Sequence, residues 1–259
     1  MESAFDAAKT RPLARFYTAE VYLLGVMALF LGLRNFPNDF AEWQSFAILT
    51  GLAVGAQFFS VTSPTRQTYR LTIAFIMAAV ILLTPSQTVL LVMAAFVVEW
   101  VVEERPWGLH VFNAAVWLVA TQGAVFIYGF LSGYQPGAEL PVYALSAPVS
   151  AAVALIAINR LLARTLMVLQ NRLPAYSIIS PPSQELLIDL SLCCLGGMIA
   201  VLWQEAIWLM LLAIPPLVLI QRSLKLPSLT AEATLDAKTA LLNARTLETA
   251  ATKEVERAL

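Results

Sequence analysis

Long runs of apolar residues, separated by short polar breaks, dominate the chain from residue 16 to residue 220. A helix needs roughly 20 apolar residues to cross a hydrocarbon core about 30 Å thick. On that measure the sequence predicts about eight membrane-spanning helices, over 16–33, 43–61, 71–83, 88–102, 109–131, 142–162, 186–203 and 206–220. The third and fourth runs are short and close together. They are interpreted either as two compact spans or as one re-entrant hairpin that enters and leaves on the same side.

Composition supports this fold class, an all-α polytopic membrane protein. Of the 259 residues, 59% are hydrophobic and 13% are charged, whereas globular domains carry about 25% charged residues. The net charge of -1 argues against nucleic acid as a partner. Cys193 and Cys194 are neighbours in an apolar run and are interpreted as small core residues. With a single histidine, the chain predicts no metal site, and no sequence motif indicates a cofactor or a catalytic centre.

Lysine and arginine in short loops set the orientation of a membrane protein. The polar segment 1–15 lacks the features of a cleavable signal peptide, so we expect the first helix to stay in the membrane. With the N-terminus inside, only Arg34 falls outside. The other loop and end positions then face the cytoplasm: Lys9, Arg11, Arg15, Arg66, Arg70, Arg105, Arg160, Arg164, Arg172, Arg222 and Lys225. An even number of crossings therefore predicts that both termini are cytoplasmic.

Ionisable residues at membrane depth are costly and so are candidates for function. Glu99 lies near the end of the fourth run; it is either functional, or reaches the cytoplasmic edge or pairs with Arg105. His110 and Asn113 open the fifth run three residues apart, on one helix face. They are interpreted as signal-sensing candidates, and the alternative for His110 is an interfacial side chain bound by water.

A second group of polar candidates lies at the end of the sixth run and the start of the seventh. Asn159, Arg160 and Arg164 end the sixth run, where arginines often bind lipid phosphate or a carboxylate. Glu185 and Asp189 begin the seventh run; a negative charge near a helix N-terminus is favoured by the helix dipole, which accounts for Glu185. Asp189 is deeper, so we expect it to pair with Arg160 or Arg164 across the bundle.

Small residues mark places where membrane helices can approach closely. Gly51 and Gly55 in the second run, and Gly196 and Gly197 in the seventh, are interpreted as packing positions. In the eighth run, Pro215–Pro216 predicts a bend, because proline removes a backbone hydrogen bond.

The polar tail after the last run carries a motif. Asp236, Thr239, Leu241, Asn243 and Arg245 spell D-x-x-T-x-L-x-N-x-R. This spacing resembles the opening of the GGDEF domain of bacterial diguanylate cyclases. The Arg105-Pro106-Trp107 break leading into Val111-Phe112-Asn113 also resembles the membrane sensory region that precedes some GGDEF and HD-type domains.

The resemblance implies a division into a cytoplasmic segment 1–15, a transmembrane sensory domain 16–225, a linker 226–235 and the start of a GGDEF-like output domain 236–259. The implied function is a sensor in the bacterial inner membrane that regulates cyclic di-GMP synthesis, as a homodimer, with a small ligand possible. The nucleotide-binding Gly-Gly-Asp/Glu-Glu-Phe hairpin does not occur in these residues, so diguanylate cyclase activity would require the protein to continue into it. The alternative is a small-solute transporter or substrate-binding membrane subunit, with the polar candidates lining a midplane site.

Overall fold

The structure is a computed structural model that describes residues 12–34, 40–58, 61–62, 68–69, 71–103, 106–133, 145–178 and 183–223, with 247 and 257. The predicted motif at 236–245 lies outside the described residues. The chain divides into two units. The first comprises Met1–Phe58 and Leu71–Ala213, and the second comprises Phe59–Arg70 and Ile214–Leu259.

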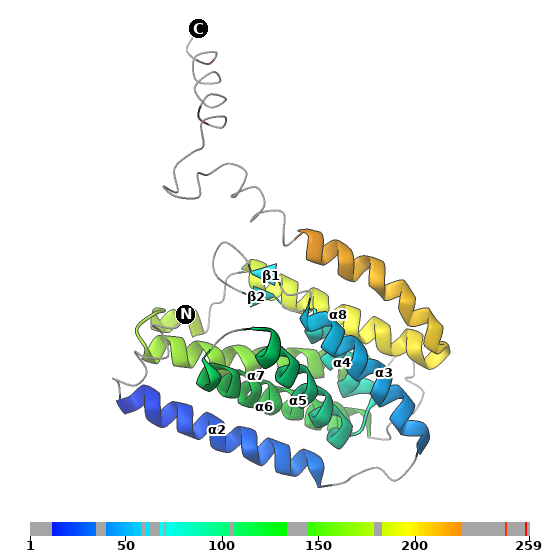
Figure 1. The fold of residues 1–259 in the computed structure, drawn as a ribbon, viewed down its shortest axis with the longest axis horizontal. Helices are drawn as coiled ribbons and strands as arrows, with labels where there is room; N and C mark the ends of the chain where they lie inside the picture. Colours follow the sequence, from blue (N-terminus) through cyan, green and yellow to red (C-terminus); the bar gives the residue numbers. More distant parts are fainter. Residues whose placement is uncertain are drawn as a thin grey trace. The chain divides into compact units, whose positions relative to one another are not determined.

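The first unit is helical throughout its described residues (Figure 1). Its elements are α2 (Pro12–Leu33), α3 (Phe40–Gln57), α4 (Thr72–Leu82), α5 (Pro85–Val102), α6 (Trp107–Ser132), α7 (Ser146–Leu169), η1 (Ala175–Ile178), α8 (Ser183–Glu205) and η2 (Ile207–Ala213). Each of the seven apolar runs up to residue 203 therefore overlaps a helix, although α3 ends at Gln57 and Val61, the predicted end of the second run, lies in β1 (Val61–Thr62).

In the second unit, β1 (Val61–Thr62) pairs with β2 (Thr68–Tyr69) as a short antiparallel ribbon. A helical segment follows from Ile214 to Ser223. Pro215 and Pro216 lie in its first turn, where a missing N–H group breaks no helical hydrogen bond. The two prolines are therefore compatible with the helix start that follows η2.

Five of the described helices are long and apolar enough to cross a membrane: Pro12–Leu33, Pro85–Val102, Trp107–Ser132, Ser146–Leu169 and Glu185–Glu205. Thr72–Leu82 and Ile207–Ser223 are shorter apolar helices. α4 has 11 residues, or about 16 Å at 1.5 Å per residue, which is only half of a hydrocarbon core. α4 alone is thus too short to be a full span.

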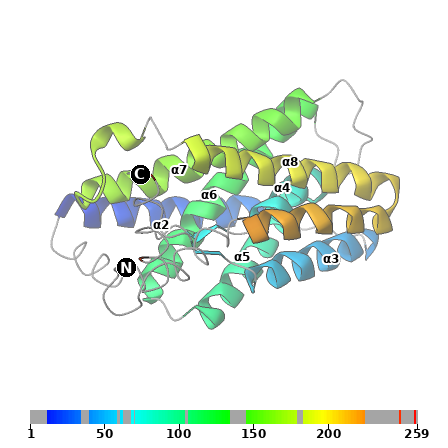
Figure 2. The ribbon, with the colours of Figure 1, turned by 90° about the horizontal axis from the view of Figure 1, so that it is seen from above.

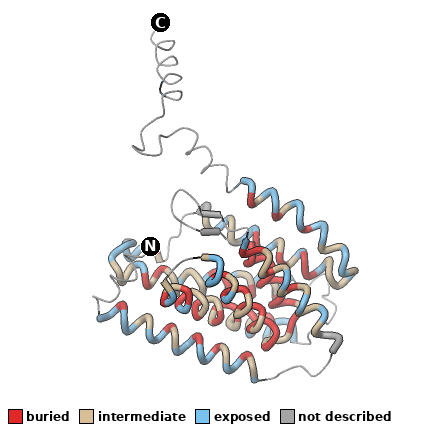
Figure 3. The backbone as a smooth tube through the Cα atoms, in the orientation of Figure 1, coloured by how far each residue is buried: buried red, intermediate tan, exposed pale blue. Residues whose placement is uncertain are grey.

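The centre of the first unit is α4. It contacts α3, α5, α6, α7 and α8, and Figures 1 and 2 show it among these neighbours. Its residues from Thr72 to Ile81 are all buried (Figure 3). A helix that is apolar on every side is expected in the interior.

The turn from α4 to α5 is closed by hydrogen bonds. The Thr84 hydroxyl accepts from the Gln87 backbone N–H at 3.4 Å, and the Gln87 side-chain oxygen accepts from the Thr84 N–H at 3.2 Å. This capping box, with Pro85 in the first turn, satisfies amides that would otherwise be unpaired. Ser86, Gln87 and Thr88, in the first turn of α5, are buried.

The outer helix α2 has large apolar side chains on its outer face, the reverse of the pattern in helices of water-soluble proteins. Its small residues face the bundle, and a Cβ added at Gly25 would lie 2.6 Å from the Ala115 Cβ on α6. Large apolar side chains point away, with Leu23 and Phe30 each 71% exposed. Small residues inside and large apolar residues outside are typical of helices that pack in lipid.

The predicted glycine contacts divide into two groups. A Cβ on Gly196 would meet the Ala74 carbonyl oxygen and, at 2.7 Å, the Met77 Cβ, so α8 and α4 approach closely there. Among the described residues, nothing lies within 4 Å of a Cβ added at Gly51, Gly55 or Gly197. Close packing is therefore confirmed for Gly196, whereas the described residues show no packing partner for Gly51, Gly55 or Gly197.

Candidate functional site

An ion-pair network joins α7 to α8. Arg160 donates to Asp189 Oδ2 from Nε at 2.9 Å and from Nη2 at 2.7 Å. Its third nitrogen, Nη1, donates to Glu185 Oε2 at 3.0 Å. Arg164 donates to the same Glu185 oxygen through Nη2. The structure thus contains the predicted pairing of Asp189 with Arg160, and it adds Glu185, whose sequence interpretation involved only the helix dipole.

The four side chains are shielded from solvent. Their exposed fractions lie between 9% for Arg164 and 18% for Asp189. Two positive and two negative charges balance, which is required because burying an unpaired charge is strongly unfavourable. Their spacing follows from the helix: Arg160 and Arg164, like Glu185 and Asp189, are four residues apart and so lie on one face.

Arg164 extends the network into the segment between the two helices. Its Nη1 donates to the backbone oxygen of Ser177, in η1, at 2.7 Å. The Ser177 hydroxyl in turn donates to the Pro174 carbonyl at 2.7 Å. One guanidinium therefore holds both α8 and the connecting turn against α7. The sequence did not reveal this contact, because a backbone carbonyl acceptor leaves no residue-type signal.

A second polar pair lies between α5 and α6. His110 Nδ1 is 3.5 Å from Glu99 Oε1, and the two side chains are 6% and 1% exposed. His110 Nε2 is 3.2 Å from the carbonyl oxygen of Glu103. That oxygen can only accept, so Nε2 carries a hydrogen, and Nδ1 faces the carboxylate.

These burial values correct two interpretations of the sequence. At 1% exposure the Glu99 side chain is enclosed by the bundle rather than exposed to solvent at the membrane edge, and at 5% exposure His110 is not a water-bound side chain. Arg105, the other partner considered for Glu99, lies outside the described residues. The pairing was missed because it depends on the register of α5 against α6, which spacing along the chain does not give.

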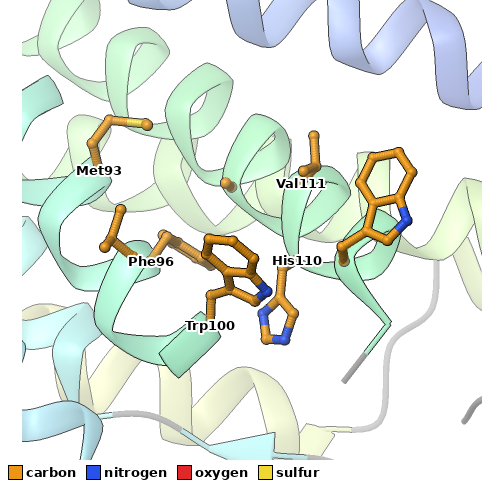
Figure 4. Close-up of a pocket in the computed structure, with 8 residues that line it drawn as sticks. Met93, Phe96, Trp100, His110 and Val111 are labelled. Atoms are coloured by element: carbon orange, nitrogen blue, oxygen red, sulfur yellow. The ribbon is translucent and has the colours of Figure 1, made fainter. Parts of the chain in front are cut away.

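His110 also lines a groove between α5 and α6 (Figure 4). It has a volume of about 220 Å³ and is lined from α5 by Met93, Phe96, Val97 and Trp100, and from α6 by Trp107, His110, Val111 and Ala114. Trp100 and His110 lie next to each other in Figure 4. The remaining lining is apolar.

The other sequence candidates are partly buried positions on the same helices. Asn113 lies on α6, one turn after His110, and Asn159 precedes Arg160 on α7. In the described part of the chain, no group of three or more His, Cys, Asp or Glu side chains is arranged to hold a metal ion. The polar candidates thus form two groups, one on α5 and α6 and the other on α7 and α8.

Comparison of the chain with protein-family models, with curated proteins and with solved structures finds no match.

Proposed function

We propose that this chain is a membrane-embedded signal-transduction module that regulates a cytoplasmic GGDEF-type output domain. The bundle would lie in a bacterial inner membrane with both ends in the cytoplasm. The support comes from the five long apolar helices, the one-sided distribution of lysine and arginine, and the motif from Asp236 to Arg245.

The observation that carries the proposal is the ion-pair network between α7 and α8. A signal received in the bundle must move a helix that leads to the output domain, and α8 is the last long helix before the tail. Arg160 and Arg164 hold the first turns of α8 through Asp189 and Glu185. Charged side chains that have a few neighbouring partners can change partners and so switch between discrete arrangements. Signalling elements require such discrete states.

The direct test is a chimera in which a complete GGDEF domain continues in register from Arg245, expressed in a strain without other cyclases. We expect the chimera to make cyclic di-GMP, and Asp189→Asn to change the amount several-fold at equal protein level. Arg172→Gln, at an exposed position, is the matched control and should leave the amount unchanged. Equal cyclic di-GMP in the wild type and Asp189→Asn would contradict the role given to the network.

Orientation and continuation of the protein have their own tests. A green fluorescent protein joined after Leu259 should fluoresce, whereas alkaline phosphatase at that position should be inactive; an active phosphatase would place the tail outside and exclude the proposal. Reading the gene beyond codon 259 should reveal about 150 further residues with a Gly-Gly-Asp/Glu-Glu-Phe hairpin. A stop codon there would favour the alternative below.

The alternative is a small-solute transporter or substrate-binding subunit, and one observation favours it. The helix α4 is too short to span and meets α5 at a capped, proline-bearing junction inside the bundle, and short proline-interrupted spans are compatible with a transporter binding site. The buried Glu99–His110 pair would then belong to the translocation route. Solute uptake into proteoliposomes that is lost in Glu99→Gln would support transport over signalling.

A further inference from the structure

The groove between α5 and α6 opens away from the helix bundle. Four of its lining residues have exposed fractions of 44% to 70%: Val97, Trp100, Trp107 and Val111. Both helices are long and apolar enough to cross a membrane. Around such helices the medium is hydrocarbon, so the groove faces lipid acyl chains rather than water.

The two ends of the groove differ in their depth along α5 and α6. α5 and α6 are antiparallel neighbours, because Glu99 near the end of α5 meets His110 near the start of α6, and Gln122 further along α6 donates to the Pro85 carbonyl at the start of α5. Trp100 and Trp107 therefore lie at one end of the groove, and Met93 and Ala114 lie seven residues further along each helix, about 10 Å deeper. Tryptophan at helix ends marks the membrane–water interface. The groove thus begins at the interface and continues inward as a purely apolar channel.

The volume and polarity of the groove limit which molecules fit into it. A volume of about 220 Å³ is below the range of about 300–1,000 Å³ that is usual for drug-sized ligands. The polar atoms on its lining side chains are the two indole N–H groups and the imidazole nitrogens of His110, and the latter face Glu99 and the Glu103 carbonyl. A molecule with a polar end beside Trp100 and Trp107, and a narrow apolar part along the rest of the groove, matches this lining.

We propose that the α5–α6 groove is a specific binding site for one acyl chain of a bilayer phospholipid, seated with its headgroup end at Trp100 and Trp107. The acyl chain lies against His110, which lines the groove and contacts Glu99. Through this site, the lipid composition of the membrane acts on α5 and α6. The site requires that the protein lies in a membrane, and it does not require a particular output domain.

The first test is lipid retention, measured by native mass spectrometry of the full chain purified in a mild detergent. We expect one phospholipid to remain per wild-type chain. Ala114→Phe fills the inner end of the groove and should lower retention at least about tenfold, which corresponds to about 1.4 kcal/mol. Ala157→Phe makes the same change at an exposed position on α7 and should retain the lipid. No retained lipid in the wild type, or equal retention in Ala114→Phe, overturns the proposal.

A second measurement is made in bilayers rather than in detergent. Of the 6 tryptophans, a variant that keeps only Trp100 is placed in bilayers containing phospholipid brominated along the acyl chain, which quenches nearby indole fluorescence. Quenching should fall when Ala114→Phe is added and stay constant with Ala157→Phe. If Ala114→Phe instead converts a lipid-free dimer into a monomer, a second copy occupies the groove, and the lipid proposal is wrong.

Discussion

Arg160 contacts Asp189 through two guanidinium nitrogens that share one carboxylate oxygen, Oδ2, at 2.9 and 2.7 Å. The remaining nitrogen, Nη1, reaches Glu185. A single planar guanidinium therefore holds two carboxylates on α8, which a lysine ammonium cannot reproduce in the same geometry.

Arg160→Lys should accordingly destabilise the bundle although it preserves the charge. We expect a loss of about 1–3 kcal/mol, because hydrogen bonds to charged groups of this kind are left unmade. Thermal unfolding in detergent measures the effect, and Arg172→Lys at an exposed position is the control. Equal unfolding temperatures for the wild type and Arg160→Lys would show that charge alone matters.

Reversing charges should rescue the network only in part. Asp189→Arg introduces a third positive charge beside Arg160 and leaves that guanidinium without its main partner, so we expect a loss of about 3 kcal/mol. Adding Arg160→Asp restores the pair with position 189 but places a new carboxylate against Glu185. The double variant should therefore unfold between the single variant and the wild type, and complete rescue would mean that the Glu185 contact is unimportant.

Arg164→Lys tests the connection to η1. The lysine can still approach Glu185, but it loses the fork that also donates to the Ser177 carbonyl. We expect faster amide hydrogen exchange at residues 175–178, measured by mass spectrometry, with little change in the centre of α8. Unchanged exchange across η1 would show that Arg164 does not hold this turn.

The Glu99–His110 contact is testable by a double-mutant cycle. Glu99→Gln removes the carboxylate that His110 faces, and His110→Gln removes the imidazole that Glu99 faces. Each single variant should lower the free energy of unfolding, and the double variant should lose less than the sum of the two. A coupling energy of about 1 kcal/mol or more is expected for residues in contact, and additive losses would argue against a direct pair.

Two adjacent glycines offer a matched comparison of packing. Gly196→Ala places a methyl group against the Ala74 carbonyl oxygen and the Met77 Cβ, whereas Gly197→Ala meets nothing within 4 Å among the described residues. We expect Gly196→Ala to destabilise by about 1–3 kcal/mol, since overpacking forces backbone shifts. Gly197→Ala should be neutral or slightly stabilising, because alanine favours a helix. Thermal unfolding of the two variants side by side checks both expectations.

The sequence by itself determined the helical segments and one of the two polar contacts. Helix positions follow from runs of apolar residues, which is a local property of the chain. The pairing of Asp189 with Arg160 was predictable because deep charges are few and costly, so each has a short list of partners. Regular four-residue spacing placed both carboxylates and both guanidinium groups on facing sides of two helices.

Only the tertiary structure decided that Glu99 faces His110, that α4 lies at the centre of its unit, and that Gly196 packs against α4. Each of these depends on the register and rotation of one helix against another. A membrane helix is apolar on all sides, so many registers bury a similar apolar area. The sequence pattern therefore does not select among these registers. Close packing of particular side chains makes that selection.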